Sequence, residues 1–164
     1  MQGYFNQPEI TESLRARLVD WVLHCTQVCE MEDKNIFFLV TEAIDTFYRL
    51  QSSPQPKAEL QLTAIAAIFI ASKLLQVNHV NLAFCHSNIG HGKFSASQIT
   101  DRETEMIDQV GWEIASPLTS FQVFELLFAM LRRRLHGCPR LDPRALEEAG
   151  GLGLDLARAA VCSL

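Results

Sequence analysis

The fold of this 164-residue chain is decided by the segment Leu60-Gln61-Leu62-Thr63-Ala64-Ile65-Ala66-Ala67-Ile68-Phe69-Ile70-Ala71-Ser72-Lys73. Between residues 62 and 71 it leaves almost no polar face, and a helix that is apolar all round is buried on all sides. Its many alanines allow neighbouring helices to approach closely. We therefore expect residues 59–76 to form the central helix of a bundle, wrapped by the other helices.

The segments on either side carry apolar residues at three- and four-residue spacing, which is typical of amphipathic helices. Thr11 is a candidate N-cap, and two pairs, Ser95 with Gln98 and Thr119 with Gln122, have the spacing of capping boxes. No segment shows sustained alternation of period two. The chain is therefore predicted to be all-α, with a five-helix bundle over residues 11–29, 33–50, 59–76, 81–87 and 95–110.

Two finer predictions concern side-chain contacts. Arg15 and Asp20, both on the first helix, are expected to form a buried ion pair. A further helix from Thr119 is expected to turn its apolar residues inward, namely Phe121, Phe124, Leu127, Phe128 and Leu131.

The composition of the chain bears on three questions, namely nucleic-acid binding, redox environment and membrane insertion. A net charge of −5 and a pI of about 5.5 disfavour a surface that neutralises phosphates, so nucleic acid is not the expected partner. Five cysteines without a secretory leader favour free thiols in a reducing compartment. The longest apolar stretch, residues 64–71, is shorter than the roughly 20 residues of a membrane span.

No enzyme motif stands out. We find no Gly-rich phosphate loop, nucleophile elbow or paired-carboxylate arrangement, so neither catalysis nor a cofactor is predicted. Cys25 and Cys29 lie four residues apart beside His24, a spacing that could place two metal ligands on one helix face. Both cysteines fall on the apolar stripe and no second ligand pair accompanies them. We interpret them as buried thiols and predict no metal site.

Several motifs in register carry a family resemblance. They are Leu14-Arg15-Ala16-Arg17-Leu18-Val19-Asp20-Trp21, Ala43-Ile44-Asp45-Thr46-Phe47, Leu60-Gln61-Leu62 and Ala71-Ser72-Lys73. In order and spacing they resemble the N-terminal cyclin box of A/B-type, mitotic cyclins. The resemblance implies an N-terminal cyclin box over residues 1–115. After Leu135 the sequence turns rich in Gly and Pro and ends in an apolar segment. We therefore expect residues 116–164 to be the truncated beginning of a second cyclin-like fold.

The resemblance implies a regulatory subunit that binds and activates a cyclin-dependent protein kinase in cell-cycle control, in the nucleus or the cytoplasm. In the family, a Lys at the end of the central helix and a Glu on the fifth helix cap backbone groups of a kinase helix. Lys73 and Glu103 match these positions, and Lys73 is the one charged residue between Glu59 and Lys93. The apolar part of the kinase contact would come from Ile70, Leu74, Ile107, Trp112 and Ile114, although each could instead be plain core.

A second site implied by the family is a docking patch on the first helix for Arg-x-Leu peptides of substrates or inhibitors. Its positions here are Leu14, Arg17, Leu18, Trp21, His24 and Gln61. Arg17 replaces an aliphatic residue, and His24 stands where an acid is usual. Because cations repel a cationic peptide, weak Arg-x-Leu binding is expected.

Two alternatives remain open. Leu74-Leu75-Gln76 replaces the usual aromatic and two acids, which suits a divergent adaptor that does not activate a kinase. The cyclin fold also occurs as a scaffold in transcription factors and pocket proteins.

Overall fold

The computed structural model describes residues 7–31, 33–75, 79–111, 114, 119–135 and 143–163. Within these ranges the secondary structure is helical and no strand occurs, so the all-α prediction is confirmed. The elements are α1 (Glu12–Val28), α2 (Asn35–Leu50), the 3₁₀ turn η1 (Lys57–Glu59), α3 (Leu60–Leu75), α4 (Leu82–Phe84), the π-helical turn η2 (Cys85–Ile89), α5 (Ala96–Val110), α6 (Ser120–Leu135) and α7 (Pro143–Ser163).

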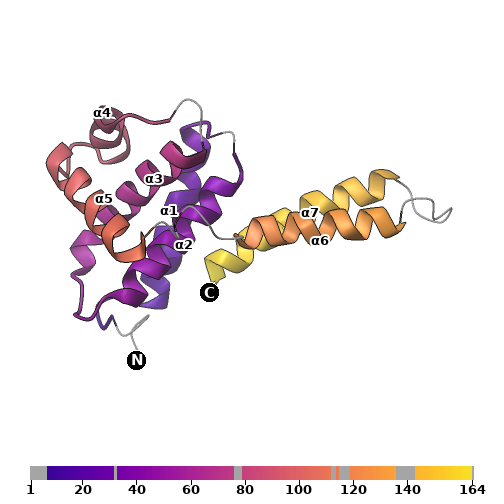
Figure 1. Cartoon of the computed structure of the whole chain (residues 1–164), viewed down its shortest axis with the longest axis horizontal. Coiled ribbons are helices and arrows are strands. Elements are labelled where there is room, and N and C mark those ends of the chain that lie inside the picture. Colours follow the sequence, from indigo (N-terminus) through magenta and orange to yellow (C-terminus); the bar gives the residue numbers. More distant parts are fainter. Residues whose placement is uncertain are drawn as a thin grey trace.

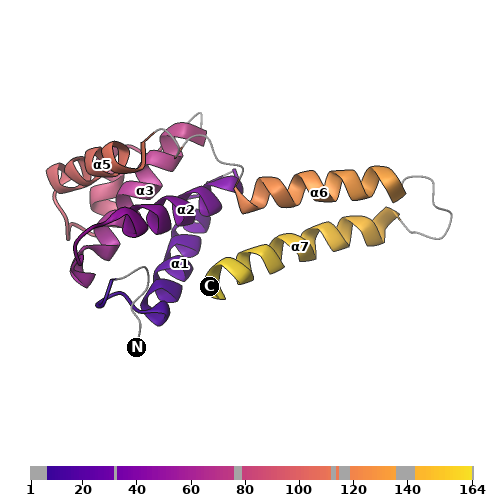
Figure 2. The ribbon, with the colours of Figure 1, turned by 60° about the horizontal axis from the view of Figure 1, so that its bottom comes forward.

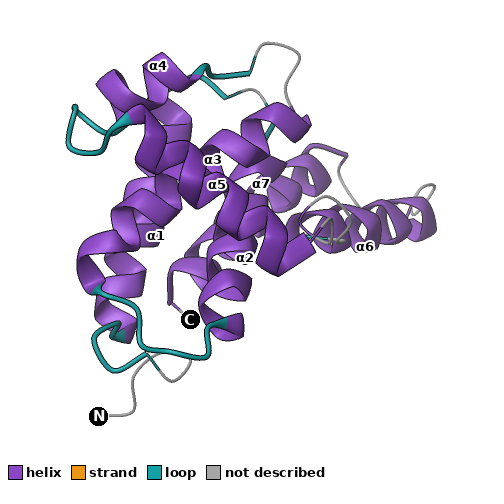
Figure 3. Cartoon of the chain, turned by 60° about the vertical axis from the view of Figure 1, so that its left-hand side comes forward, coloured by secondary structure: helices purple, strands orange, loops and turns teal. Residues whose placement is uncertain are grey.

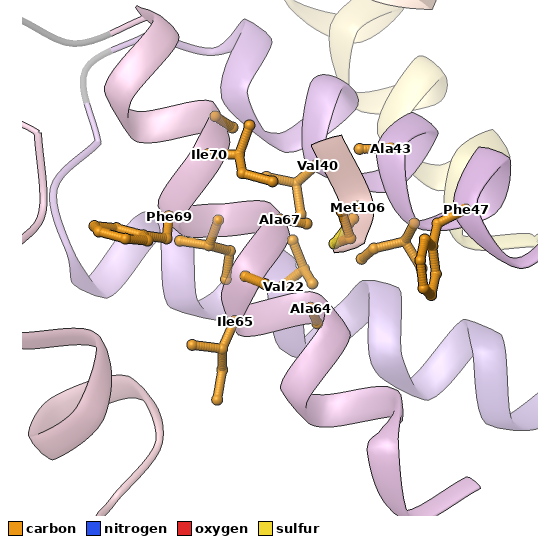
Figure 4. Packing of buried hydrophobic residues seen from close by; sticks show 14 of the residues in the cluster. Val22, Val40, Ala43, Phe47, Ala64, Ile65, Ala67, Phe69, Ile70 and Met106 are labelled. Carbon is orange, nitrogen blue, oxygen red and sulfur yellow. The ribbon is translucent and has the colours of Figure 1, made fainter. Parts of the chain in front are cut away.

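Helix α3 lies at the centre of a bundle formed with α1, α2 and α5, as Figures 1 and 3 show. Every residue from Leu62 to Ser72 is buried, and Ala64 and Ala66 are completely inaccessible. Figure 4 shows Val22, Val40 and Met106 gathered around the α3 alanines, because the small side chains admit neighbours from three helices. The prediction of a buried central helix is confirmed.

The α3 region also contains a segment that resembles a membrane-spanning helix in length and composition. Among the described residues, Lys57–Leu75 is long and apolar enough to cross a membrane by length and composition alone. In the structure, 67% of its apolar window is buried inside the fold. Its hydrophobicity is therefore explained by its burial in the core of the bundle.

The helix starts follow the predicted caps. Thr11 Oγ1 accepts from the Leu14 amide at 3.2 Å. Ser95 and Gln98 form a reciprocal capping box at 3.1 and 2.8 Å. Thr119 and Gln122 do the same at 3.2 and 3.1 Å. The three predicted caps are confirmed.

The ion pair predicted between Arg15 and Asp20 is wrong. The Arg15 guanidinium instead holds Asp45 of α2, with Nη2–Oδ2 at 2.6 Å and Nε–Oδ1 at 3.0 Å, and Asp20 is exposed. Five residues correspond to about 140° around a helix, so Asp20 points away while Arg15 faces the core. The pair fastens α1 to α2.

Helices α6 and α7 form an antiparallel hairpin that projects from the bundle (Figures 1 and 2). Its base is anchored by Thr119 Oγ1, which donates to Asn35 Oδ1, and by Phe121, whose ring stacks on Phe38 at 5.4 Å. Helix α7 runs from Pro143 to Ser163 straight through its glycines.

The prediction that all five apolar residues of α6 turn inward is partly wrong. Phe121 is buried and Phe124 and Phe128 are half-buried, but Leu127 and Leu131 are 59% and 50% exposed. The hairpin covers the phenylalanine side of α6 with α7 and leaves the leucine side to solvent. The assignment of residues 116–164 to a second cyclin-like fold stays a prediction.

Candidate partner-binding groove

A cavity of about 240 Å³ opens between the C-terminal half of α3 and the second half of α5. Among the described residues, its walls are apolar apart from one Lys and one Glu. The lining residues are Ile70, Lys73, Leu74, Glu103, Ile107, Gly111 and Ile114.

Helical spacing brings these side chains to one groove. On α3, Ile70, Lys73 and Leu74 lie at i, i+3 and i+4, and on α5 Glu103 and Ile107 lie at i and i+4, so each set shares a helix face. Gly111 ends α5 with φ +68, a left-handed conformation that favours glycine.

The polar feature of the groove is an ion pair between Lys73 Nζ and Glu103 Oε1. The Lys73 ammonium also lies 3.8 Å from the centroid of the Phe69 ring, a cation–π contact. The Lys73 side chain is 37% exposed and the Glu103 side chain 13%. The pair is thus held in place by its surroundings yet remains accessible to a partner.

Glu103 is distinguished from the other acids of α5 by position. Asp101 is exposed and accepts from Ser97 at 3.2 Å, Glu105 pairs with Arg102 at 3.3 Å, and Asp108 is exposed. None of these three lines the cavity, whereas Glu103 does.

Arg102, the neighbour of Glu103, sets the position of α5. Its guanidinium is buried, pairs with Glu59 and Glu105, and donates to Thr63 Oγ1 at 3.3 Å. These contacts fasten α5 to the beginning of α3. They fix the distance that Glu103 must span to reach Lys73.

The structure brings together six of the seven residues predicted for the kinase contact. Ile70, Lys73, Leu74, Glu103, Ile107 and Ile114 line the same cavity, and Trp112 lies outside the described residues. Ile70 and Ile114 are each 5% exposed and form the floor, whereas Leu74 is 39% exposed. Gly111, the residue after the predicted helix 95–110, also lines the cavity, and the sequence did not predict this.

The residues predicted for the docking patch are divided by the fold. Leu18 belongs to the buried core, Leu14 and Trp21 are half-buried, and Arg17 and His24 are exposed. Gln61 is half-buried, and its Oε1 accepts from Lys93 Nζ at 2.9 Å. The patch therefore consists of two partly open apolar side chains, Leu14 and Trp21, with the exposed Arg17 and His24 beside them.

A second cavity, of about 290 Å³, continues from this patch towards the end of α1. It is lined by Trp21, His24, Cys25, Val28, Cys29, Phe84, Asn88, Ile89 and His91. Burial raises the pKa of the Cys25 thiol to about 12 and also raises the pKa of Cys29. The described residues contain no group of three or more His, Cys, Asp or Glu side chains that could hold a metal ion.

The helical bundle thus carries a charged pair above an apolar groove between α3 and α5. The family model "Cyclin, N-terminal domain" matches residues 1–115, and the chain therefore belongs to the cyclin family.

Particular relatives include both G1/S and G2/mitotic cyclins. The G1/S-specific cyclin-E of Hemicentrotus pulcherrimus is 28% identical over 115 residues, which are 70% of this chain and 26% of that protein. The G2/mitotic-specific cyclin-B1 of Xenopus laevis is 29% identical over 117 residues, 71% of this chain and 28% of that protein. The G2/mitotic-specific cyclin S13-7 of Glycine max is 31% identical over 114 residues, 68% of this chain and 42% of that protein. The matched part thus spans between about a quarter and two-fifths of these relatives.

Proposed function

We propose that this chain is a non-catalytic regulatory subunit that binds and activates a cyclin-dependent protein kinase in cell-cycle control. The observation that carries the proposal is the groove between α3 and α5. There Lys73 and Glu103, which match the family's two charged kinase-binding positions, form an accessible ion pair above an apolar hollow. Family membership over residues 1–115 and the cell-cycle titles of the relatives support it.

The groove would receive the regulatory helix of the kinase. Leu74 and Ile107 offer apolar contact area, while Ile70 and Ile114 form a packed floor beneath them. The Lys73 ammonium can donate to a carbonyl of the kinase helix and the Glu103 carboxylate can accept from an amide. Because the two side chains already hold each other, little side-chain entropy is lost when the partner binds.

Activation follows from differential affinity. A surface that fits the regulatory helix in its active position stabilises that conformation of the kinase over the inactive one. The active position completes the Lys–Glu ion pair needed for phosphoryl transfer. The complex would act in the nucleus or the cytoplasm.

The patch on α1 would select peptides by charge. Arg17 and His24 are exposed beside half-buried Trp21, so a neutral or acidic peptide is favoured over an Arg-x-Leu peptide. We expect weak binding of an Arg-x-Leu peptide in a fluorescence-polarisation titration and at least tenfold tighter binding after Arg17→Ile with His24→Glu. Binding by the unmodified chain at low micromolar Kd would contradict this expectation.

An adaptor without kinase activation is the second candidate, because Leu74 is 39% exposed where it begins the divergent Leu74-Leu75-Gln76 sequence. One experiment distinguishes the two candidate functions. The chain is mixed with purified cyclin-dependent kinases, and both complex formation and phosphorylation of a generic protein substrate are followed. Activation supports the proposal. A folded chain that binds a kinase without activating it, or that binds no kinase at all, contradicts the proposal and supports an adaptor without kinase activation.

A further inference from the structure

The α6–α7 hairpin presents an apolar surface to solvent. Five large apolar side chains recur at three- and four-residue spacing along α6, and two more lie one turn apart on α7. They are between 39% and 69% exposed, namely Val123, Leu126, Leu127, Met130, Leu131, Leu152 and Leu156.

The two sets lie on the same side of the hairpin. The rings of Phe124 and Phe128 contact Gly153 and Gly150, which fixes the sides of the two helices that face each other. At about 100° per residue, the leucine stripe of α6 is roughly 110° from its α7-facing side. Leu152 and Leu156 are offset from the α6-facing side of α7 by a similar angle, and in antiparallel helices these offsets point to the same side.

The other side of the hairpin is polar, so the apolar face is a distinct surface. Exposed Glu125 and Arg132 lie away from the stripe on α6, and Arg132 pairs with Glu147 of α7 at 3.9 Å. The hairpin is therefore amphipathic as a unit. A two-helix layer with one apolar face is half of a helix bundle.

The size of the face fits a second copy of the chain. Seven large side chains at this exposure exceed the few hundred Å² of contiguous apolar surface that soluble monomers usually show. Together with flanking backbone, they approach the ~800 Å² per partner of a standard protein interface. We propose that two copies of this chain associate through these faces, so that the two hairpins form a four-helix bundle with two-fold symmetry.

Charge decides the orientation of the two hairpins. Arg132, Arg133 and Arg134 lie exposed at the distal end of α6. A parallel arrangement would bring the two arginine runs together, which costs free energy through like-charge repulsion. An antiparallel arrangement places the two arginine runs at opposite ends of the four-helix bundle and so avoids this repulsion.

The test is the molar mass of the whole chain in solution. Sedimentation equilibrium at concentrations up to about 100 µM should show the mass moving from 18.5 kDa towards twice that value. Leu127→Glu and Leu156→Glu each place two charges in the apolar interface, so each should weaken association at least tenfold. Ala129→Glu adds the same charge to an exposed position of α6 outside the stripe and should leave association unchanged.

Circular dichroism establishes that each variant keeps its helical content. A wild-type chain that stays monomeric at 100 µM would overturn the proposal and leave the face to another occupant, such as a different protein or further helices of a longer chain. A dimer that neither glutamate variant weakens would overturn it too. The face shares no residue with the α3–α5 groove, so kinase binding by Leu127→Glu is a separate readout.

Discussion

A single ion pair, Arg15 with Asp45, shows what local spacing can and cannot reveal. The motif places Arg15 on the core side of α1, and it is indeed 5% exposed. Its partner belongs to α2, thirty residues away, and periodicity within α1 carries no information about which acid of a neighbouring helix faces it. Nearness in sequence favours Asp20, which points to solvent, and so predicts the wrong partner.

Removing the Asp45 carboxylate should therefore destabilise the bundle. Asp45→Ala removes a carboxylate that accepts two hydrogen bonds from the buried Arg15 guanidinium, and the Asp45 side chain is 21% exposed. We expect a loss of roughly 2–3 kcal/mol, somewhat below the ~3–5 kcal/mol for fully buried pairs, in urea unfolding followed by circular dichroism. The control Asp20→Ala should change stability by less than about 0.5 kcal/mol. Equal losses in the two variants would refute the assignment of the pair.

The raised pKa values of the bundle's buried thiols predict that its stability depends on pH in the alkaline range. Burial raises the pKa of Cys25 and of Cys85 from 9.0 to about 12 and also raises the pKa of Tyr48. The folded state thus disfavours the charged form, and the unfolded chain loses these protons first. The protonated thiols therefore add to the free energy of unfolding in full below pH 9, and this contribution is lost as pH rises towards 12.

We expect the free energy of unfolding to fall between pH 9 and pH 12 in urea titrations at a series of pH values. The double variant Cys25→Ala/Cys85→Ala should show a shallower fall over that range, whatever its stability at neutral pH. An unchanged slope would mean that these thiols do not titrate differently in the folded and unfolded chains.

At the scale of elements, the glycines of α7 act in opposite ways. A Cβ atom on Gly150 would lie 2.8 Å from the Phe128 ring, and one on Gly153 would collide with the Phe124 ring. A Cβ atom on Gly151, between them, would have no neighbour within 4 Å. Two of the three glycines are thus needed for the close approach of α6, and the third only lowers helix propensity.

Alanine substitutions should separate these roles. Gly153→Ala should loosen the hairpin and increase amide hydrogen exchange along α6, because the Phe124 ring must move. Gly151→Ala should slow exchange in α7 and add about 0.5–1 kcal/mol of helix stability. Changes of the same sign in both variants would show that α6 and α7 do not pack through these two glycines.

The elements of the bundle could be predicted closely from the sequence, and the hairpin less well. Caps such as Ser95 with Gln98, and the lack of polar residues in α3, are local signals that the fold preserves. The stripe of α6 correctly predicts an apolar face, but periodicity does not say whether anything covers it. Leu127 and Leu131 are therefore expected inside from their spacing, yet they are exposed.

At the scale of the whole molecule, the candidate site combines two kinds of signal. Lys73 stands out in the sequence by itself, as a lone charge on an apolar helix. Glu103 could be selected among four acids of α5 only through the family resemblance, because its neighbour across the groove is thirty residues away. The bundle joins them through the Arg102 contacts that position α5 on α3.

Kinase binding through the groove is best tested by the affinity of a charge-swapped variant for an activated cyclin-dependent kinase, measured by isothermal titration calorimetry. Lys73→Glu/Glu103→Lys can keep an ion pair within the chain, so the fold should persist, while both groups offered to the kinase are reversed. We expect affinity to fall at least 30-fold, equivalent to the ~2 kcal/mol lower bound for breaking charge-assisted interface contacts. The controls Lys34→Glu and Asp108→Ala, at exposed positions outside the groove, should bind within twofold of the wild type. A folded charge-swapped variant that binds with wild-type affinity would contradict the kinase-binding role of Lys73 and Glu103.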